Sequence, residues 1–151
     1  MQRGLMVVVL LLLAASCVPD EALEPTPIPG VRGEVTGEIG VQDHTTDGTR
    51  IVIASVAIEG SPGWVVVHRD TNGSPGRVVG HAAIPEGRST DVEVRFDTIQ
   101  QSGTYWAMLH VDTGTPGEFE FPHPTDPLID GALEAAEGGL VTETVQLTVS
   151  R

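Results

Sequence analysis

Between residues 35 and 149, short apolar or alternating segments are separated by clusters of Gly, Pro, Asn, Asp and Ser. Such clusters favour tight turns, and segments of this length between them are typical of strands. The expected strands are 35–41, 50–58, 64–69, 77–83, 91–96, 104–111, 118–121 and 141–149. The sequence therefore predicts an all-β domain, an antiparallel β-sandwich of immunoglobulin-like or cupredoxin-like type with about seven or eight strands.

The expected strands differ in their hydrophobic pattern. Segment 50–58 is nearly all apolar, which favours a central position in a sheet. Segment 91–96 alternates apolar and charged residues, which predicts a strand with one solvent-exposed face. Segment 123–139 breaks the rhythm and is expected to be a long connection. Within it Asp130 is a candidate cap for one helical turn over 132–137.

The N-terminus resembles an export signal. A short start containing Arg3 is followed by the apolar run 5–13 and by small residues before Cys17, the only cysteine. The run is shorter than the roughly 20 apolar residues that span a membrane. It has the parts of a secretory signal, and Cys17 stands where a bacterial lipoprotein carries its lipidated cysteine. An ordinary signal peptide with a chance cysteine is the alternative.

Three regions follow from this organisation. Residues 1–16 are expected to be a lipoprotein signal peptide, and residues 17–32 the lipidated cysteine with a Pro-rich tether. Prolines and acidic residues punctuate the tether, which favours extended backbone without a core. Residues 33–151 are expected to form the sandwich domain. We expect the chain to lie on the extracytoplasmic face of a membrane, with the lipid anchor as its membrane partner.

The charge of the chain limits the classes of partner. It has 21 acidic and 8 basic residues, a formal net charge of −13. A nucleic-acid-binding surface requires a basic footprint, so we expect no nucleic-acid partner. The sequence also offers no pairing of a nucleophile with a base, and it predicts neither an enzyme nor a cofactor.

Histidines mark the ends of two apolar strands. His68 shares a strand face with Trp64, and His110 shares one with Met108 and Trp106, since alternate strand residues share a face. If the strands are neighbours, His68, His110 and Met108 converge, which would suit a soft metal such as copper. Hydrogen-bonded histidines at the sandwich rim are the alternative. Both tryptophans are expected to be buried.

Each of these histidines is followed two residues later by an aspartate. His68 precedes Asp70, and His110 precedes Asp112. Two imidazoles and two carboxylates meeting at one rim would form either a divalent metal site or a set of His–Asp hydrogen bonds that fixes the loops. The sequence favours the hydrogen-bonded set, because only His123 offers a third imidazole.

Two other motifs have simpler interpretations. The triplet 112–114, Asp-Thr-Gly, matches the signature of aspartic proteases, but it occurs once and is expected to be a turn. The segment 70–73 resembles the start of a calcium loop yet lacks its closing Glu, so a hairpin turn is expected there. A weak calcium site that uses Asp70, Asp112 or Asp126 is the alternative.

Four motifs occur in order along the domain: 63–70 (GWVVVHRD), 76–80, 107–114 (AMLHVDTG) and 117–122 (GEFEFP). Together they resemble a family of domains of unknown function found in exported and cell-envelope proteins of haloarchaea and some bacteria. The resemblance covers roughly residues 35–149. It implies a secreted or anchored β-sandwich and carries over no catalytic residues.

The sequence thus predicts a cell-envelope lipoprotein with a non-catalytic binding or structural β-sandwich domain. The alternative is a metal-binding sandwich, for copper handling or calcium-dependent adhesion, with His68, His110, Asp70 and Asp112 as candidate ligands. The two differ in whether the purified protein carries or takes up metal.

Overall fold

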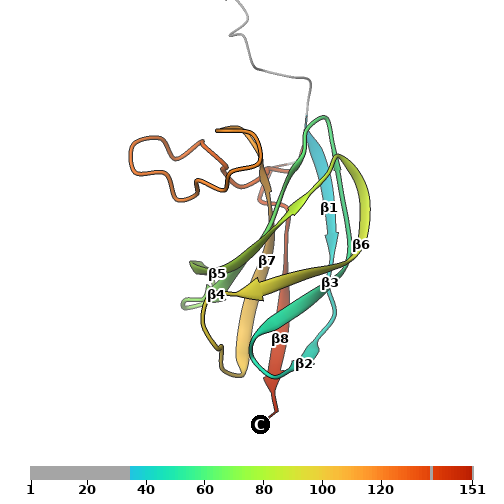
Figure 1. Cartoon of the computed structure of the whole chain (residues 1–151), viewed down its shortest axis with the longest axis vertical. Coiled ribbons are helices and arrows are strands. Elements are labelled where there is room, and N and C mark those ends of the chain that lie inside the picture. The colour runs from blue at the N-terminus through green and yellow to red at the C-terminus, as the bar shows by residue number, and fades with distance from the viewer. Residues whose placement is uncertain (1–34, 137, 151) are drawn as a thin grey trace, which may run out of the picture.

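The domain is built from strands alone. A computed structural model describes residues 35–136 and 138–150, and within them there is no helix, hence none that could cross a membrane. Eight strands follow one another along the chain (Figure 1). They are β1 (Thr36–Gly40), β2 (His44–Thr46), β3 (Arg50–Glu59), β4 (Gly63–Asp70), β5 (Pro75–Ile84), β6 (Gly87–Phe96), β7 (Gly103–Val111) and β8 (Thr142–Val149). The predicted all-β class is confirmed.

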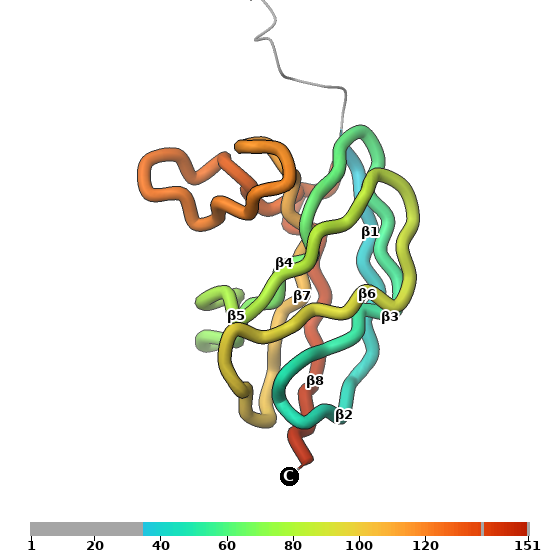
Figure 2. The backbone as a smooth tube through the Cα atoms, in the orientation of Figure 1, coloured from blue at the N-terminus to red at the C-terminus, as the bar shows by residue number. Residues whose placement is uncertain are grey.

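All eight strands belong to one hydrogen-bonded sheet, in the order β1-β3-β6-β5-β4-β7-β8-β2. Every pair is antiparallel except β2 with β8. The sheet curls, so that β1 lies against β7 and β8 and β2 lies against β3. Strand β5 connects the two halves: it pairs with β4 along most of its length and with β6 only at Gly80 and His81 (Figure 2).

The core fills the inside of the curl. Its apolar residues come from alternate positions of strands in both halves, as the pleat of a strand requires. They include Ile51, Ile53, Val56, Ile58, Val65, Val67, Val94, Leu109, Val145 and Leu147. Segment 50–58 is central as predicted, because β3 pairs with β1 on one side and β6 on the other.

Two short elements differ from the sequence prediction. Residues 118–121 form no strand and belong to an irregular segment, whereas the three-residue strand β2 was not predicted. Its sequence, His-Thr-Thr, has no apolar pattern of its own, and its backbone pairs with β8. A strand this short is specified by its partner rather than by its own residues.

The predicted helical turn over 132–137 is wrong where it is described. Asp130 is fully buried with a positive φ of 48°, which is not the backbone of a helix cap. The segment after it forms bridges instead, His110 with Ala132 and Glu134 with Leu140. Leu133 is buried in the core. The segment therefore pairs with the end of β7 and buries this leucine instead of forming a helical turn.

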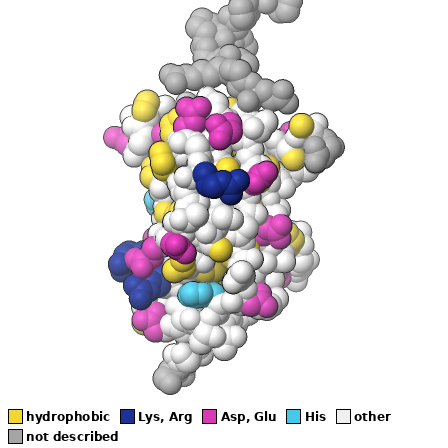
Figure 3. Space-filling view, turned by 90° about the vertical axis from the view of Figure 1, so that its right-hand side faces the viewer, with side chains coloured by type: hydrophobic (Ala, Val, Ile, Leu, Met, Phe, Trp, Pro, Cys, Tyr) yellow, Lys and Arg dark blue, Asp and Glu magenta, His cyan; other side chains and the backbone are white. Residues whose placement is uncertain are grey.

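Charged side chains lie outside the curl. Arg50 and Arg95 both contact Glu93, at N–O distances of 2.9 and 2.6 Å. Figure 3 shows one side of the molecule, where acidic side chains are spread out rather than gathered in one patch. Exposed ion pairs of this kind contribute little to stability, so the core and the backbone pairing hold the fold.

Candidate functional site

The outer face of β4 is buried as well as its inner face. Trp64, Val66 and His68 of β4 alternate with the core residues and so lie on the outer face. Across the sheet, Trp64 pairs with His110, and Val66 pairs with both Met108 and His81. We call this set the histidine face: Trp64, Val66, His68, His81, Met108 and His110.

An irregular segment, described over residues 112–136 and 138–139, covers the histidine face and projects from the sheet in Figure 1. Phe119 stacks on His81 with ring centroids 4.1 Å apart. Phe121 packs edge-on against His110, with centroids 4.6 Å apart. The cover explains why the β4 run is apolar on both faces, since neither side of this strand meets water.

His68 and His110 come together beneath this cover. Their ring centroids are 5.6 Å apart and their planes differ by 24°. His68 is 4 % exposed and His110 is 0 % exposed. The condition under which the sequence let these two imidazoles converge is met, because β4 and β7 are neighbouring strands.

Each of the two imidazoles uses one nitrogen. His68 Nδ1 lies 2.8 Å from the Gly76 carbonyl oxygen, and His110 Nδ1 lies 2.6 Å from the Asp130 carbonyl oxygen. A carbonyl oxygen only accepts, so Nδ1 carries the proton in each neutral ring. The Nε2 atom of each ring keeps a lone pair, and both Nε2 atoms are buried without a hydrogen-bond partner.

Burial also sets the charge state of these rings. It lowers the pKa of His110 to about 4, an effect that the hydrogen bond to Asp130 only partly offsets. Burial lowers the pKa of His68 too, against the opposing effect of the Gly76 carbonyl. Both rings are therefore neutral near pH 7, as a ligating or proton-accepting imidazole must be.

The two predicted carboxylates do not join the histidines. Asp70 Oδ1 accepts a hydrogen bond from Trp106 Nε1 at 2.8 Å, and Asp70 Oδ2 accepts one from the Gly73 amide. Asp112 Oδ2 accepts one from the Gly117 amide at 2.8 Å. The expected His–Asp hydrogen bonds do not form between these side chains. Backbone carbonyls orient the imidazole rings of His68 and His110, and the two aspartates stabilise turns.

Sequence reasoning missed the carboxylate that organises the cover. Asp130 is fully buried. Its Oδ2 accepts from the Glu120 amide at 2.7 Å, and its Oδ1 accepts from the Thr113 amide at 3.1 Å. Because its own carbonyl holds His110, Asp130 ties the cover to the histidine face. The sequence predicts a helix cap at Asp130, because aspartate is common at caps, but the backbone of a cap differs from the one that Asp130 adopts.

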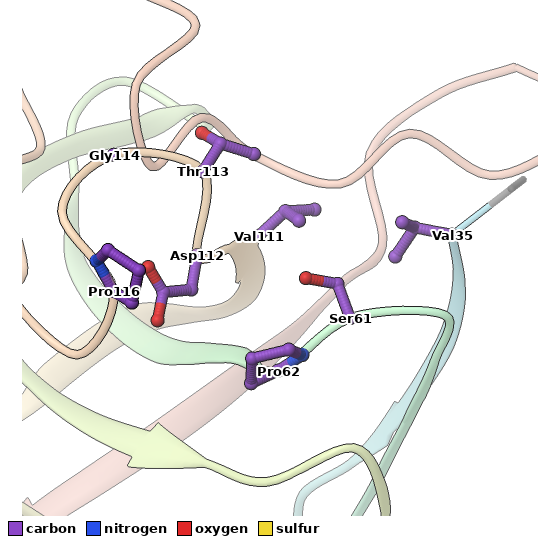
Figure 4. A pocket seen from close by; sticks show the side chains of 8 residues that line it. All are labelled: Val35, Ser61, Pro62, Val111, Asp112, Thr113, Gly114 and Pro116. Atoms are coloured by element: carbon purple, nitrogen blue, oxygen red, sulfur yellow. The ribbon is translucent and has the colours of Figure 1, made fainter. Parts of the chain in front are cut away.

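The Asp-Thr-Gly triplet lies at the rim of a separate pocket of ≈ 300 Å³. Figure 4 shows its lining, which comes from the turn before β4, the end of β7 and Val35. Asp112 contributes one carboxylate oxygen, Oδ1, that is buried without a partner. A single carboxylate cannot reproduce the shared-proton pair of an aspartic protease, so the turn interpretation holds within this chain.

Hard-metal sites need several oxygen ligands in one place. Within residues 35–136 and 138–150, no three His, Cys, Asp or Glu side chains lie close enough to hold one ion. Asp126 accepts from the Leu128 amide, and His123 Nδ1 accepts from the Asp126 amide. These side chains stabilise turns in the cover. The predicted signal peptide, lipidated Cys17 and tether lie outside the described residues.

A model of a protein family, described as Domain of unknown function (DUF7282), matches residues 37–148. The match covers nearly all of the described strands, and it confirms the predicted resemblance to a family of domains of unknown function. No curated protein and no solved structure matches the chain.

Proposed function

The chain belongs to the DUF7282 family of domains of unknown function, and from this premise we propose that it is a lipid-anchored protein of the cell envelope. Its β-domain is non-catalytic and serves in binding or as a structural module. The observation that carries the location is Cys17, the only cysteine, directly after a short apolar run that ends in small residues. Acyl chains on Cys17 would anchor the protein stably.

The end of the domain at which Val35 lies sets the orientation that an anchored protein would have. Val35, the first described residue, lines the pocket at the end of β7, and the covering segment 112–139 begins at the same end (Figures 1 and 4). Strand β8 finishes at the opposite end of the domain (Figure 1). In the anchored protein the pocket and the cover would lie on the side of the tether, and the opposite end would face outward.

We further propose that the fold is an immunoglobulin-like sandwich. With β1 and β2 taken as two parts of the first strand, the halves β1-β3-β6 and β4-β7-β8 follow the A-B-E and C-F-G order of that fold. Tyr105, near the start of β7, donates a hydrogen bond from its hydroxyl to the Gln101 carbonyl at 2.7 Å. A tyrosine bonded in this way to upstream backbone is a hallmark of immunoglobulin-like domains.

A non-catalytic role is supported by how the polar groups are used. The two buried imidazoles are oriented by backbone carbonyls, and the Asp112 carboxylate accepts a turn amide. Catalytic bases in hydrolases are instead paired with a nucleophile. The net charge of −13 and the spread of acidic side chains in Figure 3 disfavour a nucleic-acid partner.

The test uses the full chain expressed with its own N-terminus. Mass spectrometry of the membrane fraction should give a mature protein that begins at an acylated Cys17. A Cys17→Ala protein should leave the membrane fraction, with a Ser16→Ala protein as the matched control that stays. An unmodified N-terminus elsewhere, or a Cys17→Ala protein still held by the membrane, would contradict the proposal.

A further inference from the structure

The histidine face holds two buried lone pairs that its own contacts leave unused. We propose that His68 Nε2, His110 Nε2 and the Met108 thioether form a binding site for copper(I). Nothing in the described protein satisfies either Nε2 atom, although both side chains are more than nine-tenths buried. A buried polar atom without a hydrogen-bond partner lowers the stability of the fold by roughly 1–3 kcal/mol. Two such atoms on one face therefore need an explanation, and a bound ligand supplies one.

The hydrogen bonds of both rings match those of metal-ligating histidines. Such a histidine donates its other ring N–H to a carbonyl or carboxylate, which fixes the tautomer and the ring direction. His68 does this with Gly76 on β5, and His110 does it with Asp130 in the cover. Two separate elements of the fold therefore hold the two Nε2 atoms in the ligating form.

The distance between the rings suits one shared ion. Imidazole nitrogens lie about 2.0–2.1 Å from a bound transition metal, which allows two ring centroids on one ion to be up to roughly 6.5 Å apart. The observed separation of 5.6 Å falls inside this limit.

Met108 supplies the third donor. In the sheet, the pair Val66–Met108 lies between the pair Trp64–His110 and the pair His68–Trp106. Met108 therefore occupies the row between the two histidines on the same face. It is 3 % exposed and is not part of the main core cluster, which lies on the other face.

The charge of this donor set selects the ion. Two neutral imidazoles and a thioether carry no negative charge, and no carboxylate from the described residues joins them. A divalent ion would stay doubly charged in apolar surroundings, which is costly. Zinc also requires four ligands. Copper(I) carries one charge, accepts few ligands and prefers soft donors such as thioether sulfur.

The experiment is an anaerobic copper(I) titration of the full chain in detergent against a chromogenic copper(I) chelator. One copper(I) ion should bind per chain, and a Cys17→Ser variant should keep that ion, which excludes the cysteine thiol as its ligand. X-ray absorption should report nitrogen and sulfur neighbours. His68→Gln and His110→Gln should each weaken binding by more than the 10–100-fold typical of losing an outer-shell partner.

Met108→Leu tests the site even if a histidine variant fails to fold, because leucine has nearly the same volume as methionine. It should retain the fold, lose the sulfur neighbour and bind copper(I) more weakly. His44→Gln is the control: His44 lies in β2, which pairs with β8 and not with β4 or β7, so its loss should leave the affinity unchanged. No copper(I) uptake by the folded chain, or unchanged affinity in a folded His68→Gln, His110→Gln double variant, would overturn the proposal.

Discussion

The indole Nε1 of Trp106 donates a 2.8 Å hydrogen bond to the Asp70 carboxylate, across the end of β4. Asp70 is one of the carboxylates that the His-x-Asp pattern makes a candidate metal ligand, and it accepts this hydrogen bond instead. It also holds the turn 71–74, because the second oxygen of Asp70 accepts the Gly73 amide. Trp106 is only half-buried, so the expectation that both tryptophans are buried holds for Trp64 and fails for Trp106.

The two tryptophans should differ in their effect on stability. Trp64 is 5 % exposed, packed between His81 and Phe119, and Trp64→Ala should lower the free energy of unfolding by about 3–5 kcal/mol. Trp106→Phe keeps the ring contacts and loses the bond to Asp70, which should cost about 1–2 kcal/mol. Urea unfolding measures both. A Trp106→Phe loss equal to that of Trp64→Ala would contradict the difference in burial.

Tyr105→Phe tests the corner at the start of β7. The ring is 1 % exposed and should stay in place, while its hydrogen bond to the Gln101 carbonyl is lost. The expected decrease in unfolding free energy is about 0.5–1.5 kcal/mol, the usual net value of one such bond. Thermal unfolding followed by circular dichroism measures it, and Thr144→Val, at an exposed position of the neighbouring strand β8, is the control. A gain in stability would show that the bond does not help to hold this corner.

Asp130 should control the order of the cover. Asp130→Ala removes an acceptor of the Glu120 and Thr113 amides, and Asp130→Asn replaces one of its oxygens by a donor. A hydrogen bond to a charged group contributes about 1.5–3 kcal/mol, so both variants should destabilise the protein. Hydrogen exchange should rise over 112–139 before it rises in β3. Asp126→Asn, in the exposed part of the same segment, is the control with little expected change.

The pH dependence of stability follows from His110. Its pKa is lowered by burial to about 4 in the folded protein, against about 6.5 in the unfolded chain. Above pH 6.5 the ring is neutral in both states. As the pH falls from about 6.5 to about 4, only the unfolded chain takes up the proton, so the unfolding free energy falls.

The contribution of His110 to that decrease should reach about 3 kcal/mol by pH 4. The shift of the His68 pKa has the same direction and steepens the fall. Urea unfolding of the metal-free chain between pH 4 and pH 7.5 measures it. His110→Gln, which cannot titrate, should give a flatter profile, and an equally steep profile in that variant would assign the effect to other groups.

The sequence alone determined seven of the eight strands and one face of the candidate site. Alternation along a strand is a local property, so 91–96 could be read as half-buried and Trp64, Val66 and His68 as one face without knowing their neighbours. Turn residues are local too, and they placed most strand ends. The motifs from which an N-terminal signal is expected, and those that carry the family resemblance, are local as well.

Tertiary structure decided which distant segments meet. Pairing of β4 with β7 brings His68 close to His110. Asp70 instead accepts a hydrogen bond from Trp106, and Asp112 accepts one from Gly117. The local sequence around each residue does not indicate which of these partners it will have. The backbone of Asp130, the three-residue strand β2 and the cover over the histidine face depend on contacts across the fold. Hydrogen-bond partners and burial are properties of pairs of segments, and a single strand's sequence specifies only one member of each pair.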